Sequence, residues 1–141
     1  MVLLLRYIWA APASGLGLLL ALLAGPRSGR TAVVDGVLEV HGGLLSRLLR
    51  RGLPFVGSVA AITFGHVILG ADGRSLEQSR AHEHVHVRQY ERWGPLFIPL
   101  YLLVGAVLFF RGRHPYLDNP FEREAYGRQG EEHPCAGGGK A

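Results

Sequence analysis

The sequence is poor in cysteine and in charge. Cys135 is the single cysteine among 141 residues, so no disulfide can form within the chain. Charged residues make up 18% of the chain and hydrophobic residues 48%, and the hydrophobic residues are clustered. A chain of this length folds as one compact domain, and its clustered apolar segments predict that part of it contacts a membrane.

Long runs of lysine or arginine are also absent. The net charge of +4 comes almost wholly from arginines that stand alone or in pairs. No nucleic-acid-binding motif accompanies them, so we expect no nucleic-acid partner. Because the arginines lie beside apolar segments, their charge fits an anionic membrane surface, and membrane lipid is an expected partner.

The N-terminal segment, residues 1–26, contains the first long uncharged run. Residues 7–24 are uncharged and, at ~1.5 Å per residue in a helix, just long enough to cross a bilayer core. We predict a transmembrane or anchor helix, with a cleaved signal peptide or a buried core helix as alternatives. More arginines follow the run than precede it, so the positive-inside rule places the rest of the chain on the cytoplasmic side of an inner membrane.

Residues 27–128 have the pattern of a small α+β domain. Residues 31–34 and 37–40 are β-branched runs joined by Asp35-Gly36, which predicts a hairpin. Residues 44–51 predict an amphipathic helix that rests on lipid or packs on the core. Residues 60–69 favour at least one further strand. The expected sheet is small and antiparallel.

Three helices are expected after this sheet. Ser75 and Gln78 form a capping-box pattern that starts a helix ending at Trp93, before Gly94-Pro95. Residues 96–110 predict a second helix that turns back antiparallel to the first, as a hairpin. Asn119 and Pro120 then suit the N-cap and first position of a short third helix. Residues 129–141 form a Gly-rich tail that we expect to be disordered.

The first of these helices carries the sequence His82-Glu-His-Val-His86. Side chains at i and i+4 share a helix face, so His82 and His86 can offer two imidazoles to one zinc ion. Glu83 lies about 100° round the helix, where it can act as general base towards zinc-activated water. His84 points to another face, and we assign it no role.

A site with two histidines needs a third protein ligand and an open position. A helix that begins at Pro120 can bring a carboxylate back over the histidines. Glu122 and Glu124 are two residues apart and face different ways, so only one of them can bind. The candidates downstream are His114, Asp118, Glu122 and Glu124.

The His-Glu-x-x-His motif followed by a helix with Glu122-Arg-Glu-Ala-Tyr126 resembles the gluzincin metallopeptidases, especially membrane members, and small bacterial metallopeptidase-like proteins. The resemblance extends over roughly residues 60–126. It implies a zincin-like fold in which Glu122 is the third zinc ligand and a strand beside the motif helix binds extended substrate. The sequence departs from the family at Tyr126, where an aspartate would support a metal-binding histidine.

We therefore expect a membrane-associated zinc metallopeptidase that acts on a peptide or protein substrate. A non-catalytic metal-binding relative and a membrane scaffold protein are the alternatives, and no feature specifies an oligomeric state. His66, in an apolar strand, is expected to be a core residue, with lining of the cleft as the alternative. The remaining histidines are expected in loops: His41, His114 and His133.

Overall fold

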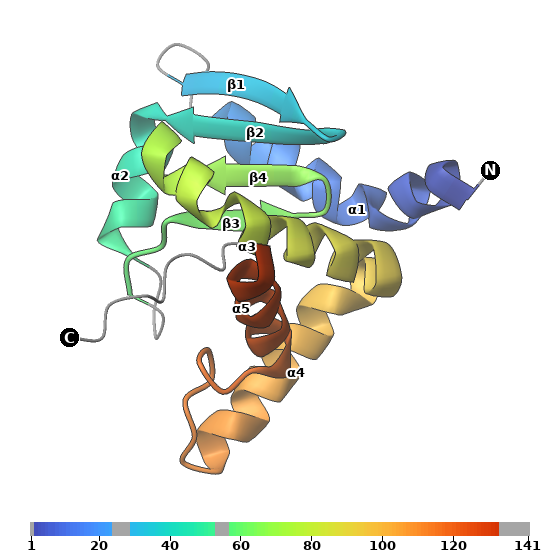
Figure 1. The fold of residues 1–141 in the computed structure, drawn as a ribbon, viewed down its shortest axis with the longest axis vertical. Coiled ribbons are helices and arrows are strands. Elements are labelled where there is room, and N and C mark those ends of the chain that lie inside the picture. Colours follow the sequence, from blue (N-terminus) through green and yellow to red (C-terminus); the bar gives the residue numbers. More distant parts are fainter. Residues whose placement is uncertain (1, 24–28, 53–56, 133–141) are drawn as a thin grey trace.

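A computed structural model describes residues 2–23, 29–52 and 57–132, with side chains as far as residue 128. The described chain is a four-stranded sheet with helices on both faces (Figure 1). This arrangement confirms the predicted α+β class, with an apolar N-terminal helix and a long helix that precedes a short one.

The strands are β1 (Gly29–Val34), β2 (Val37–Gly42), β3 (Ala61–Phe64) and β4 (Val67–Gly70), in the order β1-β2-β4-β3. The β1–β2 and β3–β4 pairs are antiparallel, as expected, but β2 and β4 are parallel. The sheet is therefore mixed, not wholly antiparallel. Every residue of β4 is buried, which places β4 inside the sheet and leaves β3 at its edge.

Two tight turns join the antiparallel pairs. The predicted turn at Asp35-Gly36 is confirmed, with φ of 51° and 78° at the two residues. The second turn, Gly65-His66, divides the predicted strand 60–69 into β3 and β4. Gly65 has a φ of 61°, which residues with a side chain rarely adopt, and a Cβ atom there would collide with Ser14. Both reasons favour glycine at this position.

The motif helix, α3, runs from Gly73 to Trp93. Its N-cap is Asp72, whose carboxylate accepts a hydrogen bond of 2.8 Å from the Ser75 amide, so the predicted N-cap at Ser75 is wrong. The helix ends at Gly94, which has a φ of 55° and precedes Pro95, as expected. A short 3-10 turn, η1 (Gly94–Leu96), links it to α4 (Phe97–Phe110).

Helix α4 turns back from α3 but diverges from it, so the two do not pack as a close antiparallel pair (Figure 1). Helix α5 (Pro120–Glu132) begins at the predicted position and packs against α3. The Asn119 side chain accepts a hydrogen bond of 3.2 Å from the Phe121 amide, as an N-cap does. Helix α5 continues past the predicted boundary at residue 128, and residues 133–141 lie outside the described residues.

The two faces of the sheet are covered by different helices. Helix α3 packs on one face, where Ile68 and Ala61 meet Leu76 and Val87. Helices α1 (Val2–Leu23) and α2 (Gly43–Arg51) pack on the other face. Residues 2–23 of the predicted anchor at 1–26 are thus part of the fold, because α1 buries Ala10, Ala13 and Gly17 against the body, while residues 1 and 24–26 lie outside the described residues.

Candidate metal centre

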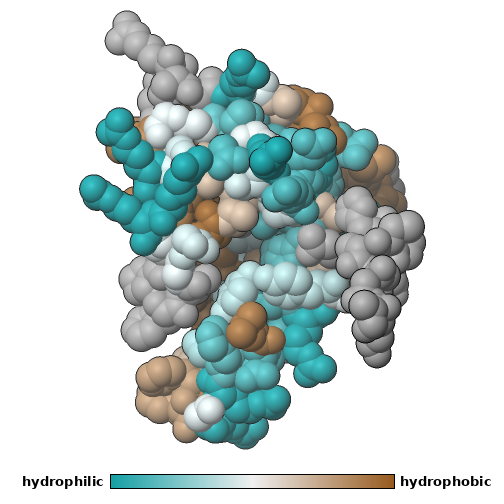
Figure 2. Space-filling view, turned by 60° about the vertical axis from the view of Figure 1, so that its left-hand side comes forward, coloured by the Kyte–Doolittle hydropathy of each residue, from teal (hydrophilic) through white to brown (hydrophobic). Residues whose placement is uncertain are grey.

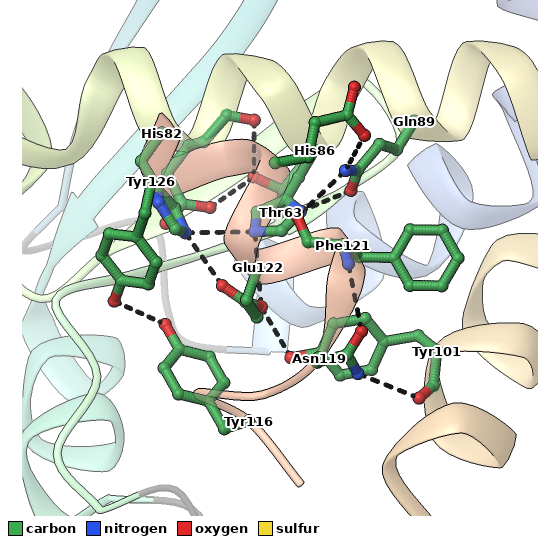
Figure 3. A network of polar contacts seen from close by, with 12 residues as sticks. Thr63, His82, His86, Gln89, Tyr101, Tyr116, Asn119, Phe121, Glu122 and Tyr126 are labelled. Atoms are coloured by element: carbon green, nitrogen blue, oxygen red, sulfur yellow. Dashed lines mark hydrogen bonds and ion pairs between the residues drawn. The ribbon is translucent and has the colours of Figure 1, made fainter. Parts of the chain in front are cut away.

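Helix α3 brings the two outer histidines of the motif together, as the sequence predicted. Their Nε2 atoms lie 3.1 Å apart, and both residues are buried. Figure 3 shows the two rings pointing from α3 towards α5. Sequence spacing alone set this arrangement, because positions four apart lie one above the other on a helix.

Helix α5 delivers Glu122 to the two rings. Its Oε2 lies 3.1 Å from Nε2 of His82, and its Oε1 lies 3.5 Å from Nε2 of His86. The side chain is only 3% exposed. The three residues form a group whose donor atoms all lie within 4.8 Å of one another. Among the described residues, no other group of three histidine, cysteine, aspartate or glutamate side chains is placed to hold a metal ion.

The charges within this group stabilise one another. Burial alone would raise the pKa of Glu122, but its contacts with His82 and His86 lower the pKa to about 2. Burial alone would lower the pKa of His86, but Glu122 and the charge of Glu83 raise it above its usual value. In the absence of a metal, the arrangement therefore favours a carboxylate facing an imidazolium.

The donor set fits a divalent metal ion such as zinc. Metal–ligand bonds of about 2.0–2.1 Å in a tetrahedral site put neighbouring donors about 3.3 Å apart. The two histidine Nε2 atoms lie 3.1 Å apart, and Oε2 of Glu122 lies 3.1 Å from Nε2 of His82, so both separations are close to that value. In addition, Oε2 of Glu122 is buried, and its 3.1 Å contact with Nε2 of His82 is an ion pair without good hydrogen-bond geometry, so the oxygen remains available to a cation.

Gln89 and Glu124 fix the orientation of His86. The Gln89 amide nitrogen donates to the Glu124 carboxylate at 2.9 Å and to the Phe121 carbonyl at 3.1 Å. Its oxygen therefore faces Nδ1 of His86, 2.8 Å away, and that nitrogen must carry the proton. The Nε2 lone pair of His86 is thereby directed at the site. Glu124 thus supports His86 through Gln89, while Glu122 contacts both histidines directly.

Sequence reasoning missed this support. Gln89 stands three residues after His86, which puts it on the same helix face, and that spacing was the available signal. Its link to Glu124 joins residues that are far apart in the chain, and no local pattern reports such a contact.

His82 has no comparable support. Its Nδ1 atom is buried without a hydrogen-bond partner in the described part of the chain. The Tyr126 ring packs against it, with centroids 4.5 Å apart, and the Tyr126 hydroxyl lies 3.1 Å from that of Tyr116. Tyr126 occupies the position at which the resembled family has an aspartate. In the structure its ring packs on His82, so His82 receives no hydrogen bond from a carboxylate at this position.

A tyrosine also contacts the third donor. The Tyr101 hydroxyl, from α4, donates to Oε1 of Glu122 at 2.6 Å. This bond directs the second oxygen of the carboxylate towards His82. No local pattern in the sequence links Tyr101 to Glu122, because the two residues lie on different helices, α4 and α5.

Glu83 lies beside the donor group and is held by the edge strand. Its Oε2 accepts a hydrogen bond of 2.6 Å from the Thr63 hydroxyl, and its side chain is buried. Glu83 does not belong to the group of three donors. Its position therefore suits the predicted role of a base better than that of a ligand.

A pocket of about 690 Å³ opens onto the three donors and Glu83. Its walls come from β3, α3 and the first turns of α4, with Tyr116 and Tyr126 completing them. Among the described residues that line it, Glu83 and Glu122 are the acidic ones, and none is a lysine or an arginine. Figure 2 shows a largely hydrophilic surface that is hollowed between its upper and lower parts, with hydrophobic side chains in the hollow.

The other candidates lie elsewhere. His114 accepts hydrogen bonds from the amides of Tyr116 and Leu117, and Asp118 accepts one from the His114 amide, so both organise the loop before α5. His66 occupies the β3–β4 turn rather than a strand, is buried beside Glu91, and does not line the pocket. His133 lies outside the described residues.

Comparisons with known proteins give no further guide to the site. No protein-family model matches the chain, and neither a curated protein nor a solved structure matches it.

Proposed function

We propose that the protein is a zinc metallopeptidase of the gluzincin type, in which His82, His86 and Glu122 hold the metal and Glu83 is the general base. The observation that carries the proposal is the meeting of three buried donors with a fourth, separate carboxylate at one pocket. Two histidines and a glutamate with an open position are the donor set of catalytic zinc sites in peptidases. Bound zinc would supply Lewis-acid chemistry, since it lowers the pKa of water and polarises a carbonyl group.

Glu83 would take up the proton that the attacking water loses and pass it to the departing amine. The Thr63 hydroxyl donates to one oxygen of Glu83 and so leaves the other oxygen available for this proton. The walls of the pocket limit the access of bulk water to the carboxylate. Tyr101 and Gln89 would keep Glu122 and His86 directed at the metal.

The edge strand offers a way to hold a peptide in the pocket. Ala60 accepts a hydrogen bond from the Ala71 amide, so its backbone faces β4. Since successive residues of a strand alternate, the backbone groups of Ala61 and Thr63 point away from β4, to the free edge. An extended peptide can pair with such an edge, and here the edge runs beside Glu83. We propose that substrate binds in this way.

A second candidate is a metal-binding protein without peptidase activity. The specific observation that favours it is the unsupported Nδ1 atom of His82 beside Tyr126. Loss of such outer support typically lowers metal affinity or activity about 10- to 100-fold.

Substitution of Glu83 separates the two candidates. Glu83→Gln keeps the shape of the side chain but removes its basicity, and exposed Glu77 on the same helix provides a matched control as Glu77→Gln. We expect zinc near one equivalent in all three proteins, measured by elemental analysis. Peptide-library hydrolysis, followed by mass spectrometry, should be lost only in Glu83→Gln. Zinc binding without hydrolysis by the wild type would favour the second candidate, and absence of zinc would refute both.

A further inference from the structure

Helix α1 has its small residues turned inward and its large apolar residues turned outward. Ala10, Ala13 and Gly17 are the residues that it buries. This distribution is the reverse of a soluble core helix, but it is common where small residues pack a helix on protein and lipid covers the remainder. The exposed large hydrophobic residues of α1 include Leu3, Leu4, Leu5, Ile8, Leu16, Leu18, Leu19, Leu22 and Leu23.

The same helix is attached to the body along most of its length. Near its start, the Arg6 guanidinium lies 3.5 Å from Glu91, and the Tyr7 ring stacks on His66 at 4.0 Å. Near its middle, the Ser14 hydroxyl oxygen accepts a hydrogen bond of 3.0 Å from the His66 amide. Further on, Gly17 lies against β3 and β4, where a Cβ atom would fall under 3.0 Å from their side chains. Helix α1 is therefore a layer of the fold.

These attachments oppose a transmembrane orientation of α1, although its length and composition would allow one. If α1 crossed a bilayer, Glu91 and His66, which lie 3.1 Å apart, would enter the hydrocarbon with it. The cost of placing ionisable groups there is several kcal/mol by order of magnitude.

A span by α4 meets a similar obstacle. The irregular segment 111–119 returns beside the helix, because Asn119 donates to the Tyr101 carbonyl at 3.4 Å and Pro115 lies next to Gly105. Irregular backbone does not persist against lipid in a bilayer core.

Helix α2 extends the apolar surface of α1 and adds charge to it. Leu45 and Leu49 of α2 pack with Leu20 and Ala21 of α1 on the sheet face opposite α3, and Figure 1 shows α1 behind the sheet. Leu45 and Leu49 of α2 face the core, whereas Leu44 and Leu48 are exposed. Arg47 and Arg51 are exposed on the same helix, and neither has an ion pair with a described residue. Leucines beside free arginines match the acyl chains and phosphates of an anionic lipid surface.

We infer that the protein is monotopic: α1 and α2 lie in the plane of one anionic leaflet, with the outward leucines in the acyl region, and neither α1 nor α4 crosses the bilayer. The metal centre, on the opposite face of the sheet, then faces water. This surface is independent of the proposed peptidase activity, because it contains none of the residues that line the pocket.

Labelling of single cysteines tests the topology. In a Cys135→Ser background, Val2→Cys places a thiol at the start of α1, Arg30→Cys places one on the exposed segment after its end, and Arg128→Cys places one on exposed α5. Spheroplasts that express each variant are treated with a membrane-impermeant maleimide before and after permeabilisation. We expect all three positions to be protected or reactive together. Reaction of Val2→Cys and Arg30→Cys from opposite sides of the membrane would refute the proposal.

Binding to vesicles tests the surface itself. Purified protein is titrated with vesicles of phosphatidylcholine, alone or mixed with phosphatidylglycerol. Leu19→Gln and Leu22→Gln should each weaken binding about tenfold, and the matched control Leu117→Gln, outside the surface, should not. Arg47→Gln should weaken binding about fivefold on the anionic vesicles only. Unchanged binding of the leucine variants, or self-association that covers α1 without vesicles, would overturn the inference.

Discussion

The assignment of different roles to Glu122 and Glu124 gives the sharpest prediction. Glu122 faces both histidines, whereas Glu124 reaches His86 only through Gln89. Each glutamate can be changed to glutamine, which keeps its size and removes its charge. We predict that Glu122→Gln abolishes the stabilisation of the protein by zinc, and that Glu124→Gln only reduces it.

The expected magnitudes follow from binding linkage. Zinc at 100 times its dissociation constant stabilises the native protein by about 2.7 kcal/mol. For a chain of 141 residues this corresponds to a rise of about 10 °C in the melting temperature. Loss of outer support weakens metal binding about 10- to 100-fold, so at the same zinc concentration Glu124→Gln retains about 0.4–1.4 kcal/mol. Glu122→Gln loses a charged ligand and should retain less than that.

The assay is thermal unfolding with and without zinc, each variant being compared with its own metal-free baseline. That baseline matters because Glu122 also stabilises the metal-free protein through the two histidines. Glu77→Gln is the matched control and should show the full wild-type shift. A larger loss in Glu124→Gln than in Glu122→Gln would mean that the ligand and its support have been interchanged, and it would refute the geometry described above.

Three further predictions concern the same centre. Gln89→Leu should weaken zinc binding about 10- to 100-fold. Its effect should not add to that of Glu124→Gln, because both residues act on His86 through one chain of hydrogen bonds. Isothermal titration of the single and double variants with zinc measures both effects. Tyr126→Asp should tighten zinc binding about tenfold by giving Nδ1 of His82 a partner, and unchanged affinity in the same titration would argue against that account. In the metal-free protein, the pKa of Glu122 is lowered from 4.5 to about 2, so its contribution to the free energy of unfolding is full above pH 4.5 and is lost as the pH falls towards 2. The pKa of His86 is raised above 6.5, so its contribution is full below pH 6.5 and is lost as the pH rises through the raised value. Urea unfolding across this range should therefore show a Glu122-dependent stabilisation that is largest between about pH 4.5 and 6.5 and absent from Glu122→Gln.

The parts of the site that the sequence predicted are those that local periodicity controls. His82 and His86 share a helix face wherever the helix forms, and Asn119-Pro120 starts α5 with Glu122 in its first turn. The choice of Glu122 over Glu124 came from the resemblance, and in the structure Glu122 is the glutamate that contacts both histidine rings.

The parts that it did not predict depend on contacts between distant segments. The parallel pairing of β2 with β4 depends on where the β3–β4 hairpin docks, and an apolar run with one internal glycine does not specify that position. The start of α3 was misplaced for a more local reason. Asp72 and Ser75 are both good N-cap residues, and only the hydrogen bond of the Asp72 carboxylate to the Ser75 amide distinguishes them.

The two proposals meet in the role of the sheet. The side chains of Ala61 and Thr63 face α3, whereas their neighbour Phe64 packs on the α1 side. The same strand therefore supports Glu83 through one face and the lipid-facing layer through the other. A change on the outward side of α1 alters no contact of this strand, so it should affect vesicle binding without affecting zinc. A change at Gly17 differs, because any side chain there would collide with β3 and β4 and would disturb the strand that holds Glu83. If outward changes on α1 reduce only vesicle binding, whereas a change at Gly17 also reduces zinc binding, then membrane attachment and metal binding use opposite faces of one sheet.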